Sequence, residues 1–412
     1  MIDTKKVKNS IKLYPIFYAF SADLIFFVPI DTLFLTLVKG LNASQISAMT
    51  MIGLLVCILS QKIVVKVTKK IGNANSVRLG AFMLLFSAII VTFGKSFISM
   101  VIYRIINELA FMFWNMTSIL LRNDLISINK GKEYFSVRNK AKILYGIMTM
   151  VTALISGYLF NIDKYIPMYI SIVIYFIIFL LSFKFYEAEV KENVEETKKE
   201  NKKVKITSMI FLVILSNAVF YSIIKMGQNN SKLFMQYDFQ KVLSIEMVTY
   251  YITIIVFLSR IARIIGNVIF GKLYLKIKDK MSIVLTVLET MAFLLLIIGH
   301  FITLNFTLKV IVMSLGFFLI LAIRDSFQVY IEDVALKITN KEEQQIIMIN
   351  IEVYRKIGQL LLSGAFALIL MKYELIVIEF ILLFLSITEV MINKKMCDKL
   401  ELNYNKTSKE SV

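Results

Sequence analysis

Twelve long apolar runs constrain this chain more than any other feature of its sequence. Each run is close to the roughly 20 residues that a helix needs to cross the hydrocarbon of a bilayer. Backbone groups inside lipid must pair within the segment, and the alternating strands of a membrane barrel do not occur here, so helices are expected. The sequence therefore predicts an all-α, polytopic membrane protein with twelve transmembrane helices, at 13–37, 45–66, 76–94, 97–120, 141–160, 166–185, 207–230, 246–270, 281–300, 305–325, 348–371 and 373–393.

Composition excludes two other classes of protein. The chain is 58% hydrophobic and only 18% charged, whereas an ordinary soluble domain is about half apolar and a quarter charged. A soluble multidomain enzyme and a disordered chain are therefore both excluded. The first apolar run is also not a signal peptide, because it is too long, holds Asp23 and Asp31, and lacks a small-residue cleavage site.

The distribution of basic residues sets the orientation of the helices. Of 47 Lys and Arg residues, 33 fall in the N-terminal segment, the tail and the loops that alternate with them, while only six fall in the other loops. Cytoplasmic loops retain Lys and Arg. We therefore expect a multi-pass protein of the plasma (inner) membrane with both termini cytoplasmic. The net charge of +18 then reflects topology and not nucleic-acid binding.

A long charged segment, 186–206, divides the helices six and six. We interpret it as a solvated cytoplasmic linker, with docking of a partner as the alternative. A short basic turn follows the second helix of each half, with Lys70-Ile71 in the first turn and Lys276-Ile277 in the second. The sequence thus predicts two pseudo-symmetric six-helix halves, as a six-helix bundle at 1–185, the linker at 186–206, a second six-helix bundle at 207–393 and a cytoplasmic tail at 394–412.

The chain resembles the major facilitator superfamily over nearly its whole length. The six-plus-six plan, the charged central segment and the two basic turns carry this resemblance, together with the string Arg104-Ile-Ile-Asn107-Glu108 in the fourth helix. The superfamily pattern has Gln where Asn107 stands and Gly where Glu108 stands. Gly72 and Gly271 match glycines of the superfamily's two cytoplasmic turns, while the other positions of those turns depart from the pattern.

The resemblance implies the superfamily's fold and a secondary transporter that works by alternating access around a site near the membrane midplane. It implies a monomer with a small-molecule substrate, a coupling ion that we expect to be a proton, and the lipid bilayer as its partners. The helix at 141–160 has Gly146 and Gly157 but lacks the Gly-Pro of superfamily antiporters. This difference from the antiporter pattern argues against proton-driven export.

Ionisable residues inside the first and fourth helices are the candidate substrate and proton-coupling groups, because each costs about 2.5–3.5 kcal/mol near the bilayer centre. In a continuous helix Asp23 and Asp31 would lie about 12 Å apart on one side. Arg104 and Glu108 are an i,i+4 pair on one face. If the two helices line a common cavity, as the resemblance implies, Asp23 or Asp31 could meet Arg104, with Asn107 nearby. The pair would then act either as a switch or as a fixed staple.

The second half offers further candidates. Lys225, Gln228 and Asn229 are expected near the outer end of the seventh helix, where they either bind a polar ligand or form a wet helix end. Arg263 is interpreted as reaching the headgroups, and Glu289 is an acid within the ninth helix. The candidate gating residues at the cytoplasmic side, for which topology or headgroup contact is the alternative, are Lys69, Lys70, Gly72, Gly271, Asp325, Glu352 and Arg355.

The sequence shows no set of catalytic residues. It has one histidine, His300, and two cysteines, Cys57 and Cys397, so no metal site, cofactor site or catalytic triad is expected. The string Gly94-Lys95-Ser96 lacks the upstream Gly of a phosphate-binding loop, which argues against ATP hydrolysis. An enzyme is therefore not expected.

Acids and aromatics within the spans favour one substrate class. The aromatics are plentiful near the acids, and carboxylates with aromatic faces suit a hydrophobic cation. Packing and lipid contact are the alternative for these rings, which are Phe26, Phe27, Phe34, Phe111, Phe113 and Trp114. The first functional hypothesis is therefore proton-coupled efflux of a hydrophobic or cationic small molecule. The alternatives are uptake of a small nutrient by symport and a transporter-like sensor or scaffold without flux.

Overall fold

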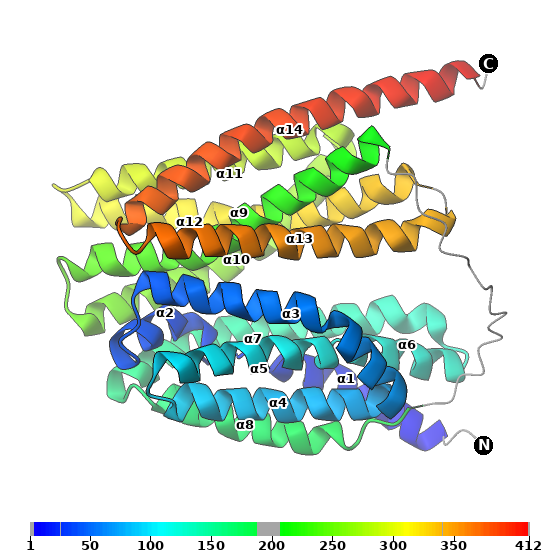
Figure 1. Ribbon diagram of the computed structural model, residues 1–412, viewed down its shortest axis with the longest axis horizontal. Helices are drawn as coiled ribbons and strands as arrows, with labels where there is room; N and C mark the ends of the chain where they lie inside the picture. The colour runs from blue at the N-terminus through cyan, green and yellow to red at the C-terminus, as the bar shows by residue number, and fades with distance from the viewer. Residues whose placement is uncertain (1–3, 25, 188–206, 340, 411–412) are drawn as a thin grey trace. The chain divides into compact units, whose positions relative to one another are not determined.

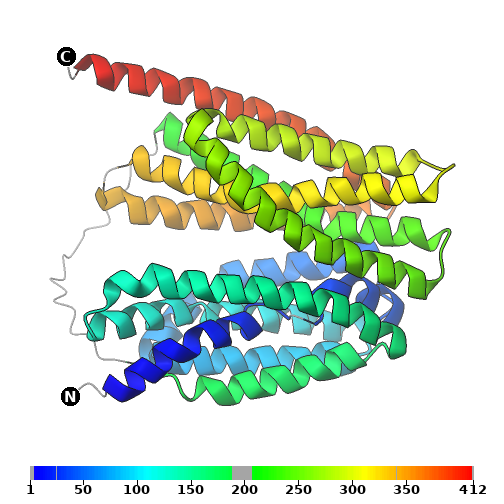
Figure 2. The ribbon, with the colours of Figure 1, turned by 180° about the vertical axis from the view of Figure 1, so that it is seen from behind.

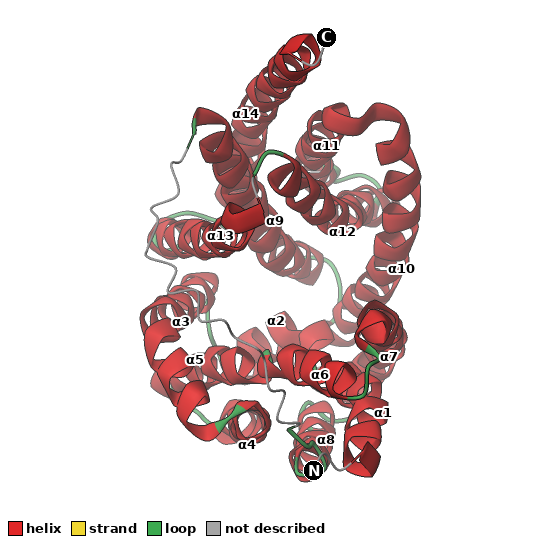
Figure 3. Ribbon diagram, turned by 90° about the vertical axis from the view of Figure 1, so that its right-hand side faces the viewer, coloured by secondary structure: helices red, strands yellow, loops and turns green. Residues whose placement is uncertain are grey.

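The computed structural model describes residues 4–24, 26–187, 207–339 and 341–410, and within these ranges the regular structure is entirely helical (Figure 3). All of the expected linker except Tyr186 and Glu187 lies outside the described residues. Nine helices of the described part are long and apolar enough to cross a membrane, and Val28–Val38 and Ile166–Ser182 are shorter apolar helices. The all-α membrane fold is therefore confirmed.

The chain forms two compact units. Unit 1 comprises Met1–Glu200 with Ile245–Phe257, and unit 2 comprises Asn201–Ser244 with Leu258–Val412. Figure 1 shows the helices of unit 1, which are α1 (Thr4–Ser21), α2 (Asp31–Leu33), α3 (Ala43–Ile71), α4 (Asn73–Phe93), α5 (Phe97–Trp114), α6 (Met116–Ser127), α7 (Tyr134–Ile162) and α8 (Ile166–Ser182). Those of unit 2 are α9 (Ser208–Gln240), most of α10 (Ile245–Ile277), α11 (Met281–Phe301), α12 (Phe306–Lys337), α13 (Lys341–Ile369) and α14 (Leu375–Glu410).

The first apolar run is a broken helix, and its prediction as one continuous span is wrong. α1 ends at Ser21, and short helical pieces resume at Val28 and continue to Val38 (Figure 2). Pro29 lies in the first turn of the resumed helix, where its missing N–H would have no helical partner in any case. The Trp114 indole N–H donates to the Ser21 hydroxyl at 2.7 Å, at the point where α1 ends. The calculated 12 Å same-face separation of Asp23 and Asp31 therefore does not apply.

Two helices of unit 2 continue well beyond the apolar runs that predicted them. α12 extends to Lys337, so about 18 Å of helix follows Asp325. α9 extends to Gln240, which places Gln228 inside the helix and not at its outer end. A charged residue ends an apolar run but does not end a helix that packs against protein. Asp325 and Gln228 therefore lie further from the ends of their helices than the sequence predicts.

The two matching turns differ in structure. Gly72 lies between α3 and α4 with φ of 84°, in the left-handed region that favours glycine. Gly271 lies within α10, with open space where a Cβ would be, and the chain turns later, at Lys278 with φ of 44°. Gly271, which matches a glycine of the superfamily's cytoplasmic turn in sequence, therefore lies inside a helix and not in the turn itself.

A carboxylate caps the N-terminus of α4 beside Gly72. Glu187 Oε1 accepts hydrogen bonds from the Asn73 backbone N–H at 2.9 Å and the Asn73 amide at 2.7 Å, while Oε2 accepts from Ala74 N–H at 3.0 Å. A Cβ at position 72 would lie 2.6 Å from Glu187 Oε2. A negative charge at a helix N-terminus satisfies free N–H groups and complements the helix dipole.

We expect Glu187→Ala to lower the free energy of unfolding by about 1–2 kcal/mol, the usual cost of losing a helix cap. Thermal unfolding of the detergent-purified protein measures this change. Glu133→Ala is the matched control, because Glu133 is about half exposed, pairs with Lys130 three residues away, and makes no side-chain cap hydrogen bond to α7. An equal effect of both substitutions would contradict the capping role.

Candidate functional site

The break in the first span exposes Asp23 to two tyrosines of unit 1. Tyr145 of α7 donates its hydroxyl to Asp23 Oδ2 at 2.8 Å, and Tyr175 of α8 donates to the Asp23 carbonyl oxygen at 2.6 Å. That carbonyl lies in the break, so the hydroxyl of Tyr175 gives it the hydrogen bond that a buried carbonyl requires. The two bonds fix both the main chain and the carboxylate of Asp23, which remains half-buried.

Aromatic rings form a wall beside Asp23. The ring of Tyr18 lies 5.2 Å from that of Trp114 and 6.1 Å from that of Tyr145, measured between centroids. Trp114 is buried, as are four of the other aromatics singled out from the sequence, which are Phe26, Phe27, Phe34 and Phe113. The structure thus places one of those six rings, Trp114, in the wall, together with the tyrosines.

Arg104 pairs within its own helix. Its Nη2 lies 2.7 Å from Glu108 Oε1, which bears out the i,i+4 pairing, and both side chains are about one-fifth exposed. The carboxylates of Asp31 and Asp23 act on Arg104 electrostatically. The contact expected between Asp23 and Arg104 is replaced by Tyr145 on one side and Glu108 on the other.

Close packing of α3 supports this arrangement. A Cβ at Gly53 would lie 2.7 Å from Arg104 Cγ and 3.3 Å from Glu108 Cγ, so glycine leaves room for both side chains. Asn107 instead packs toward α4, where its amide lies 3.4 Å from the Ser87 hydroxyl, and only 5% of it is exposed. Asn107 is therefore part of the packing between α4 and α5.

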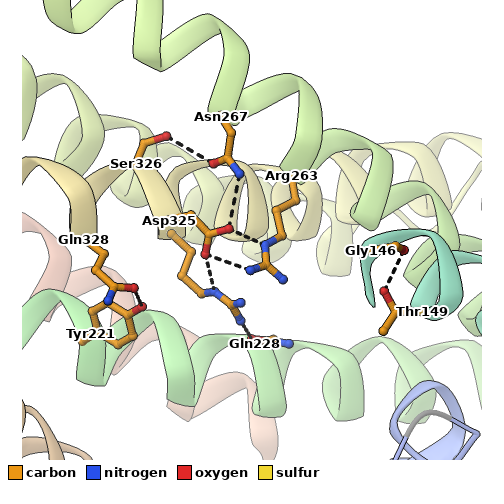
Figure 4. A network of polar contacts seen from close by, with 10 residues as sticks. Gly146, Thr149, Tyr221, Gln228, Arg263, Asn267, Asp325, Ser326 and Gln328 are labelled. Atoms are coloured by element: carbon orange, nitrogen blue, oxygen red, sulfur yellow. Dashed lines mark hydrogen bonds and ion pairs between the residues drawn. The ribbon is translucent and has the colours of Figure 1, made fainter. Parts of the chain in front are cut away.

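Unit 2 contains a network centred on Asp325 of α12 (Figure 4). Arg263 of α10 binds its carboxylate with two prongs, Nε to Oδ2 at 2.6 Å and Nη2 to Oδ1 at 3.0 Å. The amide of Asn267, one turn further along α10, donates to Oδ2 at 3.3 Å. Arg324 Nε lies 3.3 Å from Oδ1, and its Nη1 donates to Gln228 of α9 at 2.9 Å. Three helices are thereby joined.

The network carries an excess of positive charge. Arg263 and Arg324 are two guanidinium groups facing the single carboxylate of Asp325, and all three side chains are 18–24% exposed. Partial exposure and net charge together suit a site that meets a ligand or an ion better than one that only packs helices.

A second set of polar contacts in unit 2 joins side chains of α9, α12 and α13. The guanidinium of Arg355 lies over the Tyr221 ring at 4.4 Å from its centroid and pairs with Glu352 at 3.2 Å. Tyr221 donates to Gln328 Oε1 at 2.8 Å, and Gln328 donates to Glu332 at 2.8 Å. Arg263, Arg324 and Arg355 of unit 2 therefore each contact an acidic side chain.

The remaining candidate residues from the sequence differ in how exposed they are. Lys69 and Lys70 are exposed on the last turn of α3, and Lys225 and Asn229 are half-buried on α9 near Gln228. Arg263 does not extend to headgroups as expected, because Asp325 binds it.

Sequence reasoning missed Tyr145, Tyr175, Tyr221 and Asn267. The i,i+4 spacing of Arg263 and Asn267 within an apolar run could have identified one of them.

A metal site is also not formed in the part of the chain that the structure describes. No three His, Cys, Asp or Glu side chains come together there, and Cys57 and Cys397 are buried free cysteines. The candidate ligand-binding groups of the described residues are therefore carboxylates, guanidinium groups and hydroxyls.

Comparison with solved structures identifies the fold. The chain is similar to a mutant form of the nucleoside transporter NupG, at a TM-score of 0.72 and 12% identity, with 94% of this chain and 99% of that chain covered. It is similar to a bacterial homologue of the iron transporter ferroportin in its inward-facing state, at a TM-score of 0.70 and 15% identity over 95% and 98% of the two chains. The D-xylose-proton symporter follows at 0.66 and 12% identity, over 95% and 97%.

Sequence comparison identifies the family. Among curated proteins none is similar enough in sequence to match. The family description "Major Facilitator Superfamily" matches residues 15–344, which is most of the chain. Together with the three transporters of similar structure, this match indicates a membrane transporter of the secondary kind and not an enzyme. The chain belongs to the Major Facilitator Superfamily.

Proposed function

We propose that this protein exports a hydrophobic or cationic small molecule in exchange for protons, by alternating access. The observation that carries the proposal is Asp23, a half-buried carboxylate in a helix break, held by Tyr145 and flanked by aromatic rings. A carboxylate with aromatic faces attracts a cation. A proton and a cationic substrate would then compete for the same oxygen atoms, which is the simplest way to couple their movements.

The test is flux in reconstituted vesicles with an imposed pH gradient. We expect a lipophilic cation such as tetraphenylphosphonium to move against the proton gradient and to release protons when it binds. Movement of a sugar or nucleoside with protons would favour symport, binding without flux would favour a sensor, and chemical conversion would favour an enzyme. Each of these three results would overturn export.

Uptake of a small nutrient is the second candidate, and one observation favours it. Arg263 and Arg324 give the unit 2 network more positive than negative charge, and guanidinium groups bind carboxylates and phosphates well. An anionic or strongly polar nutrient fits that network better than a cation does. The same vesicles, supplied with radiolabelled organic anions, nucleosides or sugars, distinguish the two candidates.

For the orientation we propose that both termini are cytoplasmic, on the basis of the distribution of Lys and Arg. New cysteines at Asn42, Asp163 and Gln240 should react with an impermeant thiol reagent on intact cells, and one at Glu195 should react only after lysis. The unchanged protein is the control, because its own Cys57 and Cys397 are buried. Labelling at position 195 from outside would contradict the orientation.

A further inference from the structure

A pair of carboxyl groups is buried in unit 2, where α9, α11 and α14 pack together. Glu289 of α11 and Glu389 of α14 both have 0% of their surface exposed. The two carboxyl groups interact directly with each other. They lie near the middle of the apolar segments Met281–Phe301 and Leu375–Leu400, and neither takes part in the Asp325 network.

Hydrogen bonds distinguish the two acids. The Ser216 hydroxyl donates to Asn393 Oδ1 at 2.9 Å, which turns the amide nitrogen of Asn393 toward Glu389 Oε1 at 3.2 Å. Glu389 therefore has a donor that stabilises its charged form. No hydrogen-bond donor of the described residues reaches either oxygen of Glu289. An ionised Glu289 would leave two charged oxygen atoms buried without a partner.

Positive side chains are sparse in the sequence around this pair. The stretches 208–224 of α9, 281–299 of α11 and 375–393 of α14 contain no Lys or Arg. Lys394 and Lys395 follow Glu389 by five and six residues on α14, and both are exposed, whereas Glu389 is fully buried. Lys225 follows Ser216 by nine residues, which places it on the opposite side of α9 and about 13 Å along the helix. Lys278 and Lys280 precede Glu289 by a similar length of chain. Lys309, on the neighbouring α12, pairs with Asp238 at 2.8 Å.

Two adjacent carboxylates without a nearby cation cannot both be ionised, since their charges repel in a dry interior. We propose that Glu289 and Glu389 form a proton-binding site of unit 2, in which Glu289 holds the proton and donates it in a hydrogen bond to Glu389. A bound sodium ion fits less well, because hard cations take about six or more oxygen ligands. Here the oxygen of Asn393 already accepts from Ser216. The site is independent of the proposed function, because its groups and those of Asp23 belong to different units.

Infrared spectroscopy of the purified protein tests the site at neutral pH. The protonated acid of the wild-type protein should give a carbonyl-stretch band that shifts in D2O, and Glu289→Gln should remove that component. The Gln amide reproduces the donor toward Glu389, so the thermal midpoint should stay within the spread of replicate measurements. Glu374→Gln is the control and should leave the band unchanged, because Glu374 is exposed and lies immediately before α14.

Two outcomes would overturn the proposal. One is a Glu289→Gln protein that keeps the whole band, or that fails to fold, since a neutral donor of the same shape should be tolerated. The other is a saturable rise of the thermal midpoint when sodium replaces choline at constant ionic strength. That rise would identify a sodium site and would also have to disappear in Glu289→Gln.

Discussion

Asp23→Asn should reduce proton-coupled flux to the level of protein-free vesicles while leaving the protein folded. The Asn oxygen can still accept the hydrogen bond from Tyr145, and Arg104 keeps its partner Glu108. The substitution therefore removes the exchangeable proton and little else. Flux assays at equal membrane abundance, with counterflow of substrate measured in parallel, provide the readout.

Matched variants distinguish a proton-coupling role of Asp23 from a purely structural one. Asp31→Asn should be milder, because that carboxylate accepts from the adjacent Thr32 N–H at 2.6 Å and does not lie in the break. Tyr145→Phe should retain flux but shift its pH dependence. If Asp23→Asn combined with Arg104→Gln restores normal proton-coupled flux, Asp23 has only a structural role.

Asp325→Asn should destabilise unit 2 by about 3 kcal/mol, the low end of the cost of breaking a buried ion pair. The low end applies because these side chains are only partly buried. Without the carboxylate, Arg263 and Arg324 face each other with no charge to separate them. Thermal unfolding in detergent measures the loss.

A second substitution tests the charge argument. Asp325→Asn with Arg263→Gln should recover more than half of the lost stability, because one of the two guanidinium groups that contact Asp325 is removed. Glu352→Gln is the control, since that acid is 63% exposed and its ion pair is worth well under ~1 kcal/mol. A double variant that is less stable than Asp325→Asn alone would contradict the charge argument.

That the apolar runs form membrane-spanning helices could be predicted because lipid leaves the backbone few choices, although nine helices of the described residues, and not twelve, are long and apolar enough to span. The break at Ser21 could not be predicted, because Ser21 and Asp23 lie within a run that is apolar on average, and hydropathy does not report hydrogen bonding. The length of α12 was missed for the opposite reason. Arg324 and Asp325 end the apolar run, but they face protein, where charges can pair, and the helix continues past them.

The partners of the candidate residues were beyond sequence reasoning. Asp23 was singled out correctly as an acid within a span, yet Tyr145 and Tyr175 come from helices more than a hundred residues away. Glu289 was likewise visible as an acid within an apolar run. Glu389, one hundred residues later, was not connected with it, since nothing in periodicity indicates which helices become neighbours.

The pairing of Arg104 with Glu108 inside α5 has a consequence for biosynthesis. An i,i+4 pair neutralises its own helix, so α5 can leave the translocation channel for lipid as soon as it has been made. α10 is different, because the acid that binds Arg263 lies on α12 and is translated 62 residues later. Until α12 arrives, that guanidinium has to wait near the membrane surface or inside the channel. Insertion of this segment of unit 2 should therefore be cooperative, with α10 retained until α12 is available.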